Sequence, residues 1–273
     1  MVSLQPVKRS KARIYIGKKV YRFKRFGEWM FDGKKYARNR SEEKFPYVFK
    51  KHRTPLLRQL KDVDMQLQYN KITNLSIAAK QLNKVVIQPG ETFSYWRLLG
   101  NTSRRKGYVD GMILHYGKVT VGVGGGLCQL SNLLYWITLH TPLTVTERYR
   151  HSYDVFPDSN RSQPFGSGAT CAYNYLDLQI KNETQTPFQL IIYVTDTHLN
   201  GEWRSTTPTT RTYEIYEKEH HFTRELWGGY VRHNTIYRKV YDAEGNEIDD
   251  EFITENHAIT MYEPFLTYEG ETN

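Results

Sequence analysis

A glycine-rich segment that runs directly into an apolar helical pattern constrains the fold of this chain more than any other feature. Residues 122–140 read GVGGGLCQLSNLLYWITLH, and four of the first five are glycine. Glycine permits left-handed backbone conformations and lets another group approach the main chain closely. Leu127, Leu130, Leu134 and Ile137 then recur at spacings of three and four residues, which predicts a helix. Because this helix is apolar on nearly every side, we expect it to be buried in the core.

Cys128 falls in the first turn of the predicted helix. Unpaired N–H groups and the positive end of the helix dipole favour an anion there, so a thiolate would be stabilised. Cys128 is therefore a candidate nucleophile, placed beside Tyr135 at the edge of the apolar stripe. The alternative is a small buried apolar side chain, since cysteine is among the most buried residue types.

Length and composition fit a folded protein of one large domain or two modest ones. The chain has 273 residues, of which 14% are aromatic and 25% are charged, so an ample core is available. No apolar run approaches the roughly 18 residues that a membrane-spanning helix needs. The basic N-terminal segment lacks a continuous apolar stretch, which predicts no secretory signal and a cytoplasmic or membrane-peripheral location. Cys128 and Cys171 could form one bridge, but both would stay thiols in a reducing cytosol.

Charge is distributed unevenly along the chain. Residues 1–60 carry a net charge of +14 and the remainder carries −5, while residues 240–273 contain ten acidic side chains and no Lys or Arg. The first interpretation of this charge is that the basic N-terminal segment pairs with the acidic tail. The second is that the basic segment contacts an anionic membrane surface. No nucleic-acid partner is expected, because no recognition motif accompanies the charge.

The expected fold class is α+β, with helices in the first half packed on a mostly antiparallel sheet. Helical spacing between residues 72 and 86 predicts a helix, and alternation from residue 170 onward predicts strands. Residues 11–26 alternate loosely, which favours a strand pair turned at Gly17-Lys18 or an irregular arm, and Asn200-Gly201 predicts a turn. The expected division is a basic, aromatic extension (1–60), a core (61–200) and an acidic, strand-rich extension of the same domain (201–273).

Four segments resemble the VanW family. They are Ile87–Ser94 (IQPGETFS), Gly122–Ser131 (GVGGGLCQLS), Arg150–Ser152 (RHS) and Asp177–Asn182 (DLQIKN), which together span about residues 70–195 in the expected order. The resemblance implies a setting in glycopeptide (vancomycin) resistance or cell-envelope metabolism, and it implies no particular reaction. Relatives often carry an acid before the Ala-Thr step where this chain has Gly166-Ser-Gly-Ala-Thr170, so no role for an acid is carried over there.

The order of polar residues suggests thiol chemistry. Cys128 at a helix start, then His151 and then Asp177, follow the chain order of papain-like hydrolases, so a papain-like core is one arrangement that we consider. Gln129 and the backbone N–H of Cys128 could stabilise an oxyanion, and Asp154 is an alternative group to orient the imidazole. The hypothesis is hydrolysis or acyl transfer on a peptidoglycan peptide. The alternative for His151 is a loop histidine with no catalytic role, and the alternative for Asp177 is a pair with Lys181.

Two other functions compete with catalysis. In the first, the protein is a binding module that holds a cell-wall peptide or glycopeptide in an aromatic cleft. The candidate binding residues are Gly124, Gly125, Gly126, Ser131, Tyr135, Asp154, Tyr95 and Trp96, with Trp136 beside them. In the second, the protein is a scaffold for other resistance proteins, and the basic N-terminal segment is its docking surface.

No cofactor or metal is predicted. Cys128, His115, His151 and Cys171 lack the paired short spacing of a zinc site. His220 and His221 are neighbours on a predicted strand and would point to opposite faces. The glycine run is not a phosphate loop, because no Gly-Lys-Ser/Thr follows it.

Overall fold

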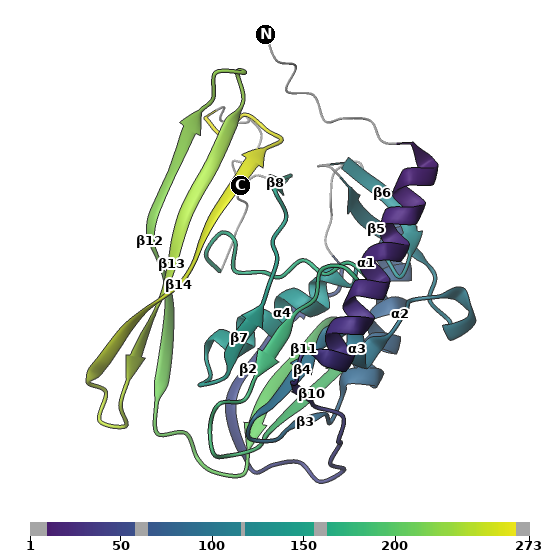
Figure 1. The fold of residues 1–273 in the computed structure, drawn as a ribbon. Coiled ribbons are helices and arrows are strands. Elements are labelled where there is room, and N and C mark those ends of the chain that lie inside the picture. The colour runs from purple at the N-terminus through teal and green to yellow at the C-terminus, as the bar shows by residue number, and fades with distance from the viewer. Residues whose placement is uncertain (1–9, 58–64, 116–117, 156–162, 266–273) are drawn as a thin grey trace.

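The computed structural model describes residues 10–57, 65–115, 118–155 and 163–265, and it confirms the α+β class (Figure 1). The helices are α1 (Lys11–Phe31), α2 (Met65–Leu82), α3 (Tyr95–Leu99) and α4 (Cys128–Leu139), with a 3-10 turn at Arg104–Lys106. The strands of the first half are β1 (Lys35–Tyr36), β2 (Tyr47–Pro55), β3 (Val86–Ile87), β4 (Glu91–Ser94), β5 (Asp110–His115), β6 (Lys118–Val123), β7 (Thr144–Glu147) and β8 (Tyr153–Asp154). The strands of the second half are β9 (Gln179–Lys181), β10 (Phe188–Val194), β11 (His198–Ser205), β12 (Thr212–Arg224), β13 (Tyr230–Tyr241) and β14 (Glu247–Thr260).

Two small sheets and two helices build the core. One sheet has the order β2-β11-β10-β3 and is antiparallel throughout, while the other has the order β1-β4-β9-β7 with one parallel pair, β1 with β4. Helix α4 packs on β2 and β11, and α2 packs on β10 and on the β5-β6 hairpin. Their apolar side chains form one continuous core, in which Leu75, Leu130, Leu134 and Trp203 are fully buried. Burial of this kind is the main term that stabilises the fold.

The C-terminal strands form a separate long sheet. Strands β12, β13 and β14 pair antiparallel, and β14 pairs in parallel with the short β8 (Figure 1). Since β8 follows residues 148–152, this parallel pair brings the segment after β7 alongside the last strand of the chain. Strand β14 thereby forms one side of the site described below.

Helix α1 replaces the strand pair or irregular arm expected over residues 11–26, so that prediction is wrong. Lys, Arg and Met are good helix formers, and loose alternation over a few residues also fits a helix with one apolar stripe. Ser10 caps the helix by accepting a hydrogen bond from the Arg13 N–H at 3.2 Å. Gly17 lies inside the helix instead of in a turn.

The turn predicted at Asn200-Gly201 is also wrong, because both residues lie inside β11. Strand β10 ends at Val194, and the hairpin turns before His198. Gly201 packs against α4: a Cβ there would lie 3.1 Å from Leu133 Cδ2, closer than most such contacts. Glycine at this position lets the helix sit close to the sheet.

The division of the chain into three parts stays a prediction. Strand β2, which falls within residues 1–60, pairs with β11 along its length and so belongs to a core sheet. Helix α1 is joined to the body by Arg25, whose guanidinium donates two hydrogen bonds to the Glu147 carboxylate at 2.6 and 2.5 Å. No helix among the described residues is long and apolar enough to cross a membrane.

Candidate functional site

The glycine-rich segment packs closely against a neighbouring strand. A Cβ on Gly125 would lie 2.2 Å from the carbonyl carbon and oxygen of Gly111 in β5, and a Cβ on Gly111 would lie 2.5 Å from the Gly125 oxygen. Asn74 of α2 donates a hydrogen bond to that same oxygen at 2.9 Å. These contacts require glycine at both positions because no side chain fits between the two backbones.

Gly124 and Gly126 have positive φ angles of 78° and 89°, in the region that favours glycine. A Cβ on Gly124 would lie 2.7 Å from Thr102 Cβ, and a Cβ on Gly126 would lie 2.3 Å from Lys71 Cγ. The described structure thus uses these glycines for close packing at the entry to α4. Their predicted role in binding a ligand stays a prediction.

Helix α4 begins at Cys128, as the sequence predicts. Burial raises the pKa of the Cys128 thiol, although the backbone N–H groups of Cys171 and Cys128 act in the opposite direction. Burial also raises the pKa of the Cys171 thiol, and the nearby Asp177 carboxylate and Cys128 add to the effect. The two cysteines are therefore neighbours, both are free thiols, and neither shows the lowered pKa of an activated nucleophile.

Gln129 and Ser131 donate hydrogen bonds to other segments of the chain. The Gln129 amide donates to the Thr54 hydroxyl and to the Pro55 carbonyl, both at 2.8 Å, and so joins α4 to the end of β2. The fully buried Ser131 hydroxyl donates to the Ala169 carbonyl at 2.6 Å. Both donors of the Gln129 amide are engaged in these contacts, which leaves none directed at an oxyanion.

Asp177 lies at the start of the short helix α3. Its carboxylate accepts hydrogen bonds from the Ser94 hydroxyl at 2.5 Å, from the Trp96 N–H at 2.9 Å and from the Leu178 N–H at 3.0 Å. Burial raises the pKa of Asp177 to about 6 despite these donors. The predicted alternative pairing of Asp177 with Lys181 is not formed, because Lys181 pairs with Glu183 instead.

The aromatic side chains proposed for a cleft lie in the core. Tyr95, Trp96, Tyr135 and Trp136 are each no more than 8% exposed. The Tyr95 hydroxyl donates to the Leu127 carbonyl at 3.2 Å, and the Trp96 indole N–H donates to the Leu176 carbonyl at 2.8 Å. Tyr95 therefore supports the backbone beside Cys128, and all four rings are packed in the core. Their predicted role in binding a ligand stays a prediction.

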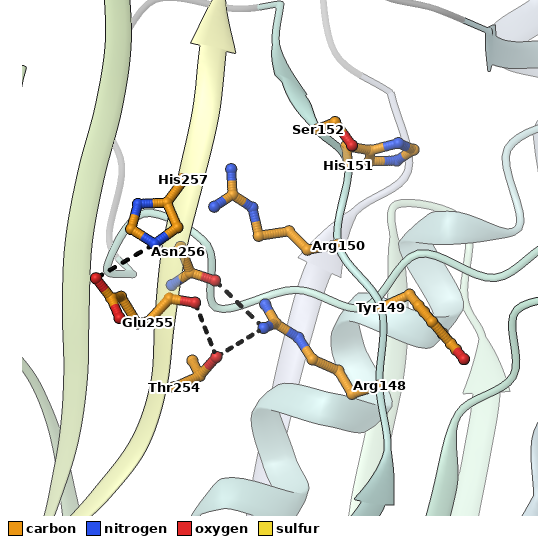
Figure 2. A pocket seen from close by; sticks show the side chains of 9 residues that line it. All are labelled: Arg148, Tyr149, Arg150, His151, Ser152, Thr254, Glu255, Asn256 and His257. Carbon is orange, nitrogen blue, oxygen red and sulfur yellow. Dashed lines mark hydrogen bonds and ion pairs between the residues drawn. The ribbon is translucent and has the colours of Figure 1, made fainter. Parts of the chain in front are cut away.

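An open pocket lies between the segment after β7 and the last strand. It has a volume of 330 Å³ and is lined by residues 148–152 and 254–257 (Figure 2). Figure 2 shows that Arg148 and Arg150 point toward β14, whereas Tyr149 and His151 point the other way. This is the alternation of an extended backbone, so two guanidinium groups lie side by side on the pocket wall.

Arg148 is held by neutral acceptors. Its guanidinium donates to the Gly168 carbonyl at 2.9 Å, to Thr254 Oγ1 at 3.1 Å, to Asn256 Oδ1 at 3.2 Å and to the Gly166 carbonyl, and it lies over the Tyr135 ring. Burial lowers the pKa of Arg148. Within the described residues no carboxylate forms an ion pair with it. The pocket wall therefore carries a positive charge that the described carboxylates leave unneutralised.

His151 and Asp154 have partners other than Cys128. Burial and the neighbouring Arg150 lower the pKa of His151, and Cys128 is not among the groups that act on it. Asp154 accepts from Arg232 at 3.2 Å and from the Tyr262 hydroxyl at 2.9 Å. Among the described residues, Cys128 therefore lies near Cys171, Ser131, Tyr95 and Asp177. His151 instead lines the pocket of Figure 2. The catalytic roles predicted for these residues stay predictions.

Arg148 was missed by the reading of the sequence, although a signal was present. Arg148 and Arg150 are two residues apart, and such residues share a face in extended backbone. The partners of Arg148 in β14 are about a hundred residues away, and no local pattern identifies them. Within the part of the chain that the structure describes, no group of three or more His, Cys, Asp or Glu side chains is arranged to hold a metal ion. The side chain of His115, one of the weak zinc candidates, lies outside the described set.

The chain belongs to the VanW family. The family described as VanW-like protein matches residues 70–204. This range includes most of α2, the glycine-rich segment, α4 and the pocket residues 148–152. The vancomycin B-type resistance protein VanW of Enterococcus faecalis is 34% identical over 232 residues, which cover 85% of this chain and 84% of that protein. The uncharacterized protein YoaR of Bacillus subtilis is 33% identical over 117 residues, or 42% of this chain and 36% of that one. No solved structure matches, so a papain-like core stays a prediction.

Proposed function

We propose that this chain is an accessory protein of glycopeptide resistance and that it binds the carboxylate end of a cell-wall peptide in the pocket of Figure 2. Similarity to the enterococcal vancomycin B-type resistance protein supports the first part. The observation that carries the second part is Arg148, a cation on the pocket wall that no described carboxylate neutralises. A peptide carboxylate would supply the missing negative charge.

The charges and size of the pocket fit this ligand. Arg148 and Arg150 lie on one wall, and Glu255, the one acid among the described lining residues, lies 3.2 Å from the His257 ring. Four of the five N–H donors of Arg148 are engaged by described acceptors, so Arg148 would contribute its charge and one remaining N–H to a carboxylate. The volume of 330 Å³ lies at the small end of the range for ligand sites, about 300–1,000 Å³, which suits the end of a short peptide.

Thiol catalysis has weaker support than binding. A cysteine nucleophile needs a lowered pKa and a nearby base. Burial raises the pKa of Cys128, and His151 is not among the groups that act on it. The hypothesis that Cys128 hydrolyses or transfers an acyl group therefore remains a prediction, and the experiment below includes a variant that tests it.

Calorimetry with the full chain tests the proposal. The ligands are a short cell-wall peptide that ends in a free carboxylate and the same peptide with an amidated end. We expect the free acid to bind and the amide to bind at least tenfold more weakly, because a hydrogen bond to a charged group contributes about 1.5–3 kcal/mol. Arg150→Gln should weaken binding of the acid by a similar factor. Arg105→Gln, which removes an exposed charge far from the pocket, is the matched control and should bind normally.

Two results would contradict the proposal. If the amide binds as tightly as the acid, or if Arg150→Gln binds like the unmodified chain, the carboxylate is not recognised in this pocket. Cys128→Ser separates binding from catalysis. It should bind the peptide normally, and if the unmodified chain consumes the peptide while Cys128→Ser does not, the protein is a thiol enzyme.

A further inference from the structure

Helix α1 carries an apolar stripe on the side that faces away from the body. Ile16, Val20, Phe23, Met30 and Phe31 are between 58% and 82% exposed. The spacing of four and then three from Ile16 to Phe23 places these three side chains on one helical face, and Met30 continues it. On the opposite face Arg25 and Trp29 are buried, whereas Ile14 and Tyr21 are 45% and 48% exposed. Isolated apolar side chains are common on protein surfaces, whereas a continuous stripe marks an interaction site.

Basic side chains border this stripe. Lys19 lies along one edge, and Arg13 and Lys24 lie along the other, as the helical geometry of α1 dictates. The sequence of α1 contains seven Lys or Arg residues and a single acid, Glu28, which pairs with Arg25 at 3.3 Å and lies 3.9 Å from Lys24. An apolar stripe with cationic edges is the pattern of helices that lie in the surface of an anionic bilayer.

A second pocket opens beside the stripe. It has a volume of 210 Å³ and is lined by Lys19, Arg22, Phe23, Phe26, Asn101 and Tyr173. The Arg22 guanidinium lies 5.2 Å from the centre of the Tyr173 ring, and its Nε is buried where no described residue accepts a hydrogen bond from it. The pocket thus combines two cations, an unsatisfied donor and two phenylalanines. A phosphate that carries an acyl chain matches this combination.

We propose that α1 docks on an anionic phospholipid membrane, with its apolar stripe in the bilayer surface and a lipid phosphate between Lys19 and Arg22. Charge complementarity selects this occupant over a second copy of the chain, since pairing two α1 helices would bring their positive charges together. The bidentate contact of Arg25 with Glu147 and the buried Trp29 hold α1 on the body while its outer face stays free. The apolar stripe of α1 and its basic edges are thus the surface through which the basic N-terminal segment would contact an anionic membrane.

Sedimentation of the full chain with lipid vesicles tests the proposal. We expect the chain to bind vesicles that contain phosphatidylglycerol, to bind pure phosphatidylcholine vesicles far less, and to dissociate when the ionic strength approaches about 1 M. Lys19→Gln should weaken binding about fivefold, the effect of one basic residue near an anionic surface. Phe23→Ser should weaken it about tenfold through lost apolar burial.

Matched controls and a direct probe complete the test. Leu226→Ser and Arg105→Gln change exposed residues elsewhere and should bind as the unmodified chain does. Because Phe23 is 73% exposed, Phe23→Ser should keep its circular dichroism spectrum. Trp fluorescence of a Phe23→Trp variant should be quenched by brominated lipids if this position enters the bilayer.

Four outcomes would overturn the proposal. The first is an absence of binding to phosphatidylglycerol vesicles, and the second is equal binding by Lys19→Gln, Phe23→Ser and the controls. The third is a concentration-dependent dimer, without vesicles, that Phe23→Ser abolishes, since a second copy would then cover the stripe. If inorganic phosphate alone perturbs Lys19 and Arg22 while vesicles do not, the second pocket binds a free anion and the membrane contact is refuted.

Discussion

His140, directly after α4, should make the folded protein less stable in acid. The ring is buried, and its Nδ1 lies 2.9 Å from the Trp136 carbonyl. Burial lowers the pKa of His140 from 6.5 to about 4, and repulsion from Lys50, His52 and Arg238 acts in the same direction, whereas the Trp136 carbonyl opposes it. The folded chain therefore binds a proton at His140 less readily than the unfolded chain does.

The size and sign of the effect follow from proton linkage. As pH falls from 6.5 toward 4, the unfolded chain binds a proton at this position and the folded chain does not, so the free energy of unfolding falls. The difference between the two pKa values corresponds to about 3 kcal/mol at 1.36 kcal/mol per pH unit. A domain whose total stability is about 5–15 kcal/mol would show this loss clearly.

Asp177 should act in the opposite direction. Burial raises its pKa from 3.8 to about 6, so between these values the folded chain binds a proton that the unfolded chain does not, and stability rises as pH falls. The two effects partly cancel in the unmodified protein. The contribution of His140 is therefore measured as a difference between two chains that share every other titrating group.

Urea unfolding of the unmodified chain and of His140→Gln, at about pH 7 and about pH 4.5, measures this difference. We expect the unmodified chain to lose about 2–3 kcal/mol more than the variant on acidification, because glutamine does not titrate. In Asp177→Asn the free energy of unfolding should change in the opposite direction to His140→Gln. This variant should lose more stability on acidification than the unmodified chain does. If the stability difference between His140→Gln and the unmodified chain is the same at both pH values, burial does not hold His140 neutral and the reasoning is refuted.

Two further predictions concern packing and α1. Gly125→Ala should lower the free energy of unfolding in urea by about 3 kcal/mol, because its Cβ would lie 2.2 Å from the Gly111 carbonyl. Ala78→Gly is the comparison, and a smaller loss for Gly125→Ala than for this variant would show that the two backbones separate easily. Arg25→Met should cost about 3 kcal/mol by leaving the Glu147 carboxylate without its cation, and Arg25→Met combined with Glu147→Gln should recover part of that loss. Additive losses in the double variant would contradict the ion pair.

Patterns that depend on near neighbours in sequence were predictable. The helix that begins at Cys128, the helix that contains Ile72 and the strands after residue 170 all follow from apolar spacing. Helix α1 was not predicted because its outer face is apolar and exposed. Its sequence therefore lacks the usual helical pattern of one apolar face toward the core and one polar face toward solvent. The turn predicted at Asn200-Gly201 is wrong because Gly201 lies within β11 and packs closely against α4, which lies more than sixty residues earlier.

The candidate site was predictable only in part. The sequence identifies the glycine-rich segment, Cys128 and the Arg150–Ser152 step. The pocket depends on the parallel pairing of β8 with β14, which places Arg148 against Thr254 and Asn256. Long-range strand pairing of this kind carries no local signal. For the same reason the burial that raises the pKa of Cys128 was not foreseen from its place at a helix start.

The reciprocal contact of Gly111 with Gly125 restricts how the chain can change over evolutionary time. In most packed pairs a larger residue on one side can be accommodated by a smaller residue on the other, so the two positions drift together. Here each residue is already the smallest available and the obstacle to each is the partner's backbone. Neither position can therefore change first, and no second substitution rescues the change. We expect relatives that keep this junction to hold both glycines invariant, and those that lose one to have rebuilt the entry to α4.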